Sequence, residues 1–296
     1  MKSVRLVLGS GGARGMAHIG VIEELERNGY RIVEVAGSSM GAIVGGIYCT
    51  GHLPEYKHFL VGLSKLDVFN LLDFTLNAQG FVKGERVLKA VEQLIGDHFI
   101  ENFSVPFTAV AADVVSRKEV HFRSGSLFRA LRASMAIPTI FTPVTEGRMQ
   151  LVDGGVLNPL PLDVVKREPD DLLVAVNLNA YWPQEKKQEV VNQEKAAYEK
   201  MLEAFRTQIL RIDNKAEEKV EKLGLFDLLN KSADMVQERV TELMIKAHQP
   251  DVLVNIHTNV CGIFEFYRAN EVIEEGRRAF YKAMEEPRNK MKDAWI

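Results

Sequence analysis

The chain has 296 residues and a formal net charge of -3, and 46% of its residues are hydrophobic and 26% charged. This composition is that of an ordinary globular protein, which excludes the disordered and fibrous classes. A slightly acidic chain also lacks the basic surface that nucleic-acid binding requires, so nucleic acid is not expected as a partner. Cys49 and Cys261 lie far apart in apolar surroundings, which predicts buried free thiols and no disulfide or thiolate metal site.

The first elements of the chain alternate between strand and helix. Val4–Leu8 is a short apolar run, too short for a signal-peptide core, and glycines and a helical pattern over Ala17–Arg27 follow it. The unit then repeats with a strand at Ile32–Ala36, a tight turn at Gly37–Gly41 and a helix that includes Ala42–Tyr48.

Later strands are expected where short runs rich in Val, Ile and Leu recur. These runs are Phe107–Ala112, Val120–Arg123, Leu151–Val152, Leu172–Leu178 and Val252–Ile256. Alternating strands and helices predict an α/β fold with a mainly parallel sheet between helical layers, where functional sites gather at the carboxyl ends of strands. The glycine-rich segments after the first two strands fall at that edge.

One long stretch departs from this alternation. Glu185–Lys246 is highly charged, has no proline and contains one glycine, Gly224, which predicts long helices. We therefore expect one domain over residues 1–296 with a helical insertion at 181–225. Within it, Tyr198–Leu223 carries an apolar stripe at spacings of three and four. The stripe is compatible with packing on the same chain, with self-association into a homo-oligomer, or with a lid or lipid contact.

The turn at Gly37–Gly41 matches GxSxG, with Ser39 at its centre. An apolar strand before it and a helix after it form the context of a nucleophile elbow, in which a serine on a strained turn needs small neighbours such as Gly37 and Gly41. The alternative is a plain helix cap made by Ser38 or Ser39.

The loop Ser10–Gly15 lies between the first strand and its helix, so its backbone N–H groups converge on one anion-sized spot. One interpretation is a dinucleotide pyrophosphate site, for which Glu34 would supply the usual acidic residue. The other is an oxyanion hole for an ester attacked by Ser39. Two adjacent strand-to-helix turns, one with donors and one with a hydroxyl, favour the oxyanion hole.

A nucleophilic serine needs a base. His257 follows a late apolar strand, where an ordinary α/β-hydrolase would place its histidine, whereas His18 lies just inside the first helix, where packing is expected. Asp153 is the better candidate because it ends an apolar strand that breaks into Gly154 and Gly155. The alternative for Asp153 is a simple Asp-Gly turn.

Taken in order, these three motifs resemble those of the patatin-like phospholipases. The glycine loop ends in Arg-Gly, GxSxG follows, and Asp-Gly-Gly comes third. The runs GGARGMAHIGVIEEL, RASMAIPTIFTPV and LVDGGVLNPLP are similar to stretches typical of the bacterial and neuropathy-target-esterase-like branch. The resemblance covers most of the chain outside roughly residues 181–225.

The resemblance implies a three-layer α/β/α fold and a Ser-Asp dyad with no histidine. It makes Ser39 the nucleophile and Asp153 the base, with Gly11, Gly12 and Arg14 in the oxyanion loop. The motif-supporting positions are Gly15, Gly37, Gly41, Gly154 and Gly155. The chain departs from many members at Ser10, where they have glycine.

The expected reaction is hydrolysis of an acyl ester in a phospholipid, a lysophospholipid or another fatty-acyl lipid, by way of an acyl-enzyme. Neither a metal nor an organic cofactor is expected. No segment approaches the ~20 apolar residues of a membrane-spanning helix, so a cytoplasmic protein with at most peripheral membrane contact is expected. Two alternatives stay open: an ordinary α/β-hydrolase that uses His257, and an anion- or nucleotide-binding module without turnover.

Overall fold

The computed structural model describes residues 2–71, 74–77, 80–82, 84–182 and 225–285. By its contacts the chain divides into one unit of Met1–Tyr181 with Ala233–Ile296, and a second unit, Trp182–Ser232. All of the expected site residues belong to the first unit. The apolar stripe at Tyr198–Leu223, and with it the question of self-association, lies outside the described residues.

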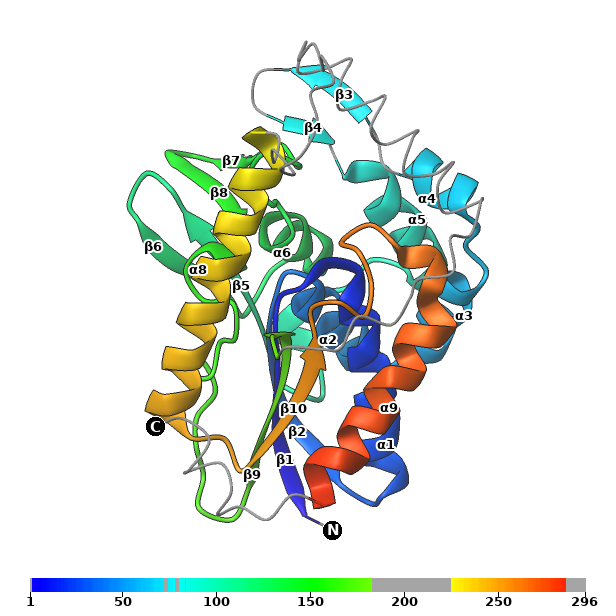
Figure 1. The fold of residues 1–296 in the computed structure, drawn as a ribbon, viewed down its shortest axis with the longest axis vertical. Helices are drawn as coiled ribbons and strands as arrows, with labels where there is room; N and C mark the ends of the chain where they lie inside the picture. Colours follow the sequence, from blue (N-terminus) through cyan, green and yellow to red (C-terminus); the bar gives the residue numbers. More distant parts are fainter. Residues whose placement is uncertain (1, 72–73, 78–79, 83, 183–224, 286–296) are drawn as a thin grey trace, which may run out of the picture. The chain divides into compact units, whose positions relative to one another are not determined.

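The first unit is built on an eight-stranded sheet with the order β10-β9-β1-β2-β5-β8-β7, in which β6 also pairs with β5 (Figure 1). Five strands run parallel, and β6, β7 and β8 are antiparallel additions at one side. The strands of this sheet are β1 (Ser3–Leu8), β2 (Arg31–Ser38), β5 (Phe107–Asp113), β6 (Lys118–Phe122), β7 (Val144–Glu146), β8 (Met149–Asp153), β9 (Leu172–Ala180) and β10 (Val252–His257). Every strand expected from the sequence is present.

Three strands were not expected. β7 is a three-residue partner of β8. The strands β3 (Phe74–Asn77) and β4 (Gly80–Val82) form a separate antiparallel pair. All three are too short to show the alternation of polar and apolar residues by which strands are recognised.

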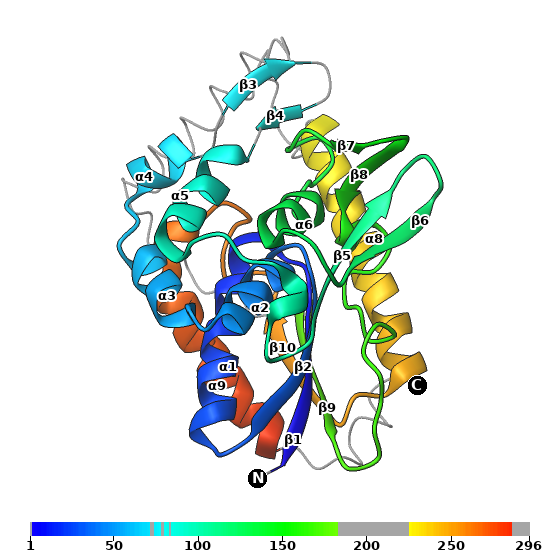
Figure 2. The ribbon, with the colours of Figure 1, turned by 180° about the vertical axis from the view of Figure 1, so that it is seen from behind.

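Helices cover both faces of the sheet, as expected for an α/β/α fold. In both views α1, α2 and α9 lie on one side of the sheet and α8 on the other (Figures 1 and 2). Alternate side chains of β1 explain the two layers: Val7 packs in the core cluster that includes Ile245 of α8, whereas Leu8 faces Gly45 of α2. The helices are α1 (Ala17–Arg27), α2 (Met40–Thr50), α3 (Leu53–Val61), α4 (Lys65–Leu71), α5 (Glu85–Ile95), α6 (Leu127–Ser134), α8 (Leu225–His248) and α9 (Ala269–Glu285).

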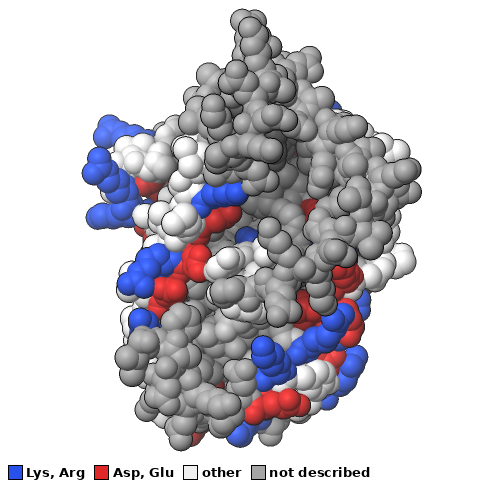
Figure 3. Space-filling view, in the orientation of Figure 1, with Lys and Arg blue, Asp and Glu red and all other residues white. Residues whose placement is uncertain are grey.

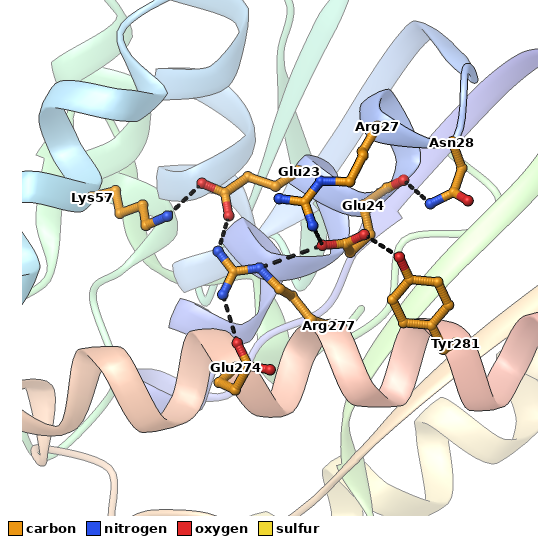
Figure 4. A network of polar contacts seen from close by, with 8 residues as sticks. All are labelled: Glu23, Glu24, Arg27, Asn28, Lys57, Glu274, Arg277 and Tyr281. Atoms are coloured by element: carbon orange, nitrogen blue, oxygen red, sulfur yellow. Dashed lines mark hydrogen bonds and ion pairs between the residues drawn. The ribbon is translucent and has the colours of Figure 1, made fainter.

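The helices α1 and α9 touch backbone to backbone. A Cβ added at Gly20 would lie 2.1 Å from the carbonyl oxygen of Ile273, and one added at Gly276 would lie 2.1 Å from that of Ala17. Beside this crossing, the Arg277 guanidinium contacts Glu23 and Glu24 of α1, and the Tyr281 hydroxyl donates to Glu24 at 2.6 Å (Figure 4). The Glu24 carboxylate is fully buried, so the ion pair and hydrogen bonds compensate for its lost hydration.

Replacing Gly276 by alanine is expected to lower the free energy of unfolding by about 3 kcal/mol, at the upper end for overpacking, because backbone atoms would have to move. Urea unfolding followed by circular dichroism measures the loss. The matched control is Gly62→Ala, because Gly62 has a φ of -77° and a Cβ there would meet nothing closer than 3.5 Å. Equal unfolding midpoints for the two variants would contradict this account of the crossing.

The surface of the described part carries charges of both signs. Figure 3 shows Lys and Arg side chains interspersed with Asp and Glu on the face seen in Figure 1. Among the described residues, no helix combines the length and the apolar character needed to cross a membrane.

Candidate active site

Ser39 occupies the turn between the carboxyl end of β2 and the start of α2. Its φ of 55° and ψ of -123° are rare for a residue with a side chain, and such backbone strain persists only where the surroundings enforce it. Here the Ser39 N–H donates to the Ser134 hydroxyl at 2.9 Å, and that hydroxyl donates to the Val110 carbonyl at 2.6 Å. The strained turn is therefore fixed to both α6 and β5.

The glycines on either side of the turn are required by space. A Cβ at Gly37 would lie 2.4 Å from the carbonyl carbon of Gly41, and a Cβ at Gly41 would lie 2.1 Å from the carbonyl oxygen of Leu8. The second contact is to the end of β1, so the turn is packed directly against the strand that leads into the glycine loop. This geometry is that of a nucleophile elbow.

The glycine loop meets the elbow because β1 and β2 are parallel neighbours with Leu8 opposite Gly37. A Cβ at Gly15 would lie 2.1 Å from Cγ of Met40, the residue after the elbow serine. Within the described residues, the N–H groups of Gly11 and Gly12 have no acceptor outside regular secondary structure, whereas the N–H of Ala13 donates to the Ile263 carbonyl. The first two N–H groups are thus available to an oxyanion.

Arg14 is bound inward, to backbone. Its Nε donates to the Gly11 carbonyl at 3.1 Å and its Nη1 to the Thr258 carbonyl at 3.2 Å, and only 7% of the residue is exposed. Burial lowers the pKa of the guanidinium, while the charge of Asp234 acts in the opposite direction. These contacts support a role in bracing the glycine loop.

Arg14→Lys is expected to lower kcat/KM about tenfold, because one ammonium cannot keep both carbonyl contacts of the planar guanidinium and the loop donors lose their alignment. The loss should be equal on neutral p-nitrophenyl esters and on phospholipids. Arg31→Lys, at an exposed position at the opposite end of β2, is the control. A defect confined to phosphate-bearing substrates would contradict bracing and indicate that Arg14 binds the lipid phosphate.

Asp153 reaches the elbow from an antiparallel strand. β8 runs opposite to β5 with Asp153 beside Ala111, and β5 in turn pairs with β2, with Val110 beside Ser38. The strand therefore ends level with the elbow, two strand positions away from β2. Glycine is needed after it, since a Cβ at Gly154 would lie 2.2 Å from the Val110 carbonyl oxygen.

The Asp153 carboxyl is buried and only half satisfied. Its Oδ1 accepts from the Gly155 N–H at 2.7 Å, whereas Oδ2 has no hydrogen-bond partner within 3.5 Å among the described residues. Burial raises the pKa of Asp153 to about 7, against the lowering influence of the Ser39 side chain and of the Gly155 N–H. A carboxyl with a pKa near neutrality is suited to general base catalysis.

Neither histidine considered from the sequence lies beside Ser39 in the way a catalytic base must. His257 is on β10, three strands or about 14 Å from β2 in the sheet order, and its Nδ1 accepts from the Asn259 N–H. His18 is fully buried, its Nε2 is 2.9 Å from the Gly9 carbonyl oxygen, and burial lowers its pKa to about 4.

The acidic residue that a dinucleotide site would need is also engaged elsewhere. Glu34 forms an ion pair with Arg5, which binds Asp171 as well. Among the described residues, no group of three or more His, Cys, Asp and Glu side chains could hold a metal ion. Cys49 and Cys261 are buried and unpaired, as the sequence suggested.

Two residues that support the elbow were not identified from the sequence. Ser134 accepts from the Ser39 N–H, and Asn158 accepts from the Ser38 hydroxyl through its carbonyl at 2.6 Å. Ser134 lies within the run RASMAIP that contributed to the family resemblance, but a hydroxyl inside a helix carries no sequence signal of its own.

Comparison with known proteins matches residues 6–166 to the family model described as patatin-like phospholipase. The chain belongs to the patatin-like phospholipase family. An uncharacterised NTE family protein of Mycobacterium tuberculosis is 34% identical, and the alignment covers 95% of this chain and 91% of that protein.

Two further proteins are similar to this patatin-like chain over part of their length. A protein named lysophospholipase NTE1, of Yarrowia lipolytica, is 34% identical over 60% of this chain and 13% of its own length. VipD of Legionella pneumophila covers 95% of this chain with a TM-score of 0.41 at 11% identity, and 67% of the VipD chain is aligned. The family match and the NTE family relatives confirm the patatin-like, neuropathy-target-esterase-like branch that the motifs resemble.

Proposed function

We propose that this patatin-like chain is a serine lipid-acyl hydrolase that works with a Ser39-Asp153 dyad and an oxyanion hole made by the glycine loop. The observation that carries the proposal is the convergence of three strand ends. Within the part of the chain that the structure describes, β1 leads into backbone donors without an acceptor, β2 into a strained serine, and β8 into a buried carboxyl with one oxygen that has no partner. The candidate residues come from distant parts of the sequence and meet at one edge of the sheet.

In the first half of the reaction, the Asp153 carboxylate accepts the proton of the Ser39 hydroxyl as its oxygen attacks the ester carbonyl. The N–H groups of Gly11 and Gly12 stabilise the negative oxygen of the tetrahedral intermediate. Collapse of the intermediate expels the alcohol part of the lipid, which takes the proton from Asp153, and leaves Ser39 acylated.

In the second half, Asp153 accepts a proton from water, which attacks the acyl carbonyl. The second tetrahedral intermediate collapses, the fatty acid leaves, and the proton returns to the Ser39 oxygen. Substrates are thus fatty-acyl esters such as phospholipids or lysophospholipids, which the chain would meet by peripheral contact with a membrane. We further propose that residues 1–296 act as one catalytic domain with the helical insertion at 181–225.

Labelling with a fluorophosphonate, followed by peptide mass spectrometry, tests the nucleophile. We expect the adduct on Ser39 and no adduct in Ser39→Ala, because only a nucleophilic serine attacks the phosphorus. Profiling of the fatty acids released from a panel of phospholipids and lysophospholipids then defines the substrate class. His257→Ala should keep its labelling and its hydrolysis, and loss of both in a folded His257 variant would favour a histidine base.

A further inference from the structure

Three polar side chains follow one another along the helix α8. Asp234, Gln237 and Thr241 recur at spacings of three and four, and the next position of the same stripe is Ile245, which belongs to the core cluster. Thr241 is 1% exposed, and its hydroxyl has no hydrogen-bond partner among the described residues. Asp234 at the start of the stripe is exposed, whereas Gln237 is partly buried and Thr241 is buried. Buried polar side chains are costly unless they serve a partner, so this inner part of the stripe requires an explanation.

Two of these side chains act on the loops of the candidate site. The charge of Asp234 raises the pKa of Arg14, and the charge of Arg14 lowers the pKa of Asp234. Gln237 reaches the turn after the catalytic strand, because its Nε2 lies 3.0 Å from the point where Gly155 would carry a Cβ.

Two other polar atoms surround that same point. The Ser10 hydroxyl oxygen lies 2.8 Å from it and Oδ1 of Asp153 lies 3.0 Å from it. The three atoms are therefore within about 6 Å of one another, a separation that one water molecule can bridge. A side chain at position 155 would collide with these atoms, so the close approach of the three groups requires glycine.

Ser10 supplies the second observation. The residue is 3% exposed, and its hydroxyl has no hydrogen-bond partner among the described residues. A buried hydroxyl without a partner, near an amide donor and a carboxylate oxygen, indicates a hydrogen-bond network that needs a further member.

We propose that Gln237 is a positioning residue for the catalytic carboxylate: with Ser10, and through a water molecule that bridges the three groups, its amide binds Oδ1 of Asp153. This inference rests on the proposed function, in which Oδ2 serves Ser39. The arrangement holds one carboxylate oxygen and leaves the other for the proton of the serine.

The Gln237 amide is expected to lower the proton affinity of the Asp153 carboxylate. Donors aimed at a carboxylate stabilise its charged form, so the amide opposes the effect of burial. The groups that face Asp153 are the Ser39 and Ser10 hydroxyls, the Gly155 N–H and the Gln237 amide. Burial raises the pKa of Asp153, and the Ser39 side chain and the Gly155 N–H oppose it, which leaves the Gln237 amide as the group of α8 to vary.

The first test is the pH profile of kcat/KM on a soluble ester. In Gln237→Met the acid limb should move up by about one pH unit, and in Gln237→Glu further, because a second carboxylate repels the first. Ser10→Gly should move the limb in the same direction, and the double variant should show less than the sum of the two shifts. Arg239→Met, at an exposed position of α8, is the control and should leave the limb in place. An unmoved limb in both Gln237 variants overturns the inference.

The second test does not require activity. The pH dependence of the urea midpoint, compared with that of Asp153→Asn in the same background, reports where Asp153 takes up its proton. This pH should rise in Gln237→Met by the same amount as the kinetic limb. A chain without hydrolysis or Ser39 labelling would refute the proposed function, while this measurement would still decide whether Gln237 acts on Asp153. If Asp153 takes up its proton at the same pH in Gln237→Met as in the wild type, the proposed contact between Gln237 and Asp153 is overturned.

Discussion

Ser39→Ala and Asp153→Asn are each expected to lower kcat/KM for ester hydrolysis by at least about a thousandfold, and the double variant should lose little more than either alone. The two groups act on one proton, so removing either one disables the same step. Steady-state hydrolysis of p-nitrophenyl esters and of a lysophospholipid measures the effect, with circular dichroism to confirm the fold.

The neighbouring serine supplies the control for this experiment. The Ser38 hydroxyl donates to the Asn158 carbonyl at 2.6 Å and is therefore held away from substrate. Ser38→Ala should retain fluorophosphonate labelling at Ser39. The dyad assignment would be refuted by a folded Asp153→Asn variant with wild-type turnover.

Asp153→Asn is also expected to stabilise the protein in alkaline solution. Burial raises the pKa of Asp153 to about 7 in the folded chain, from an ordinary value of 3.8, so the folded state prefers the protonated carboxyl. Below about pH 4 the carboxyl is protonated in both states and costs nothing. As the pH rises from there through 7, the unfolded chain ionises first and the native state loses up to about 4 kcal/mol relative to it.

Asparagine does not titrate and can still accept the Gly155 N–H, so the variant escapes this loss. Its advantage in free energy of unfolding should be small near pH 4.5 and should grow until about pH 7.5. Urea denaturation across this range measures the difference. Asp163→Asn is the control, because it makes the same substitution at an aspartate that accepts from Asn158 and lies outside the dyad. A stability difference independent of pH would show that the buried carboxyl does not titrate near neutrality.

The local elements of the fold could be predicted from the sequence because their signals are local. The helix at Ala17–Arg27 was expected with the bounds it has, and the strands that form the parallel core were expected within a few residues. Apolar runs of this length are buried on both faces, as in a central parallel sheet. The strands β3, β4 and β7 were missed because three or four residues cannot show a period.

The nucleophile turn was identifiable for a similar reason. Gly37, Ser39 and Gly41 lie within five residues. The atoms that leave no room for a side chain at the two glycines belong to that segment and to the neighbouring strand β1. Asp153 was a weaker inference from its own residues, since an Asp-Gly pair is usually a turn, and it gained support only from the order of the three motifs.

The sequence by itself determined the family, the α/β alternation and the candidate residues, since each is written in short contiguous segments. Only the tertiary structure decided how those residues meet. β8 runs antiparallel, so its last residue reaches the elbow because pairing with β5 stops at Ala111. The tertiary structure also brings Gln237 of α8 to the turn at Gly155, which lies 82 positions earlier in the chain. Contacts between such distant segments depend on sheet order and helix packing, which no periodicity within a segment encodes.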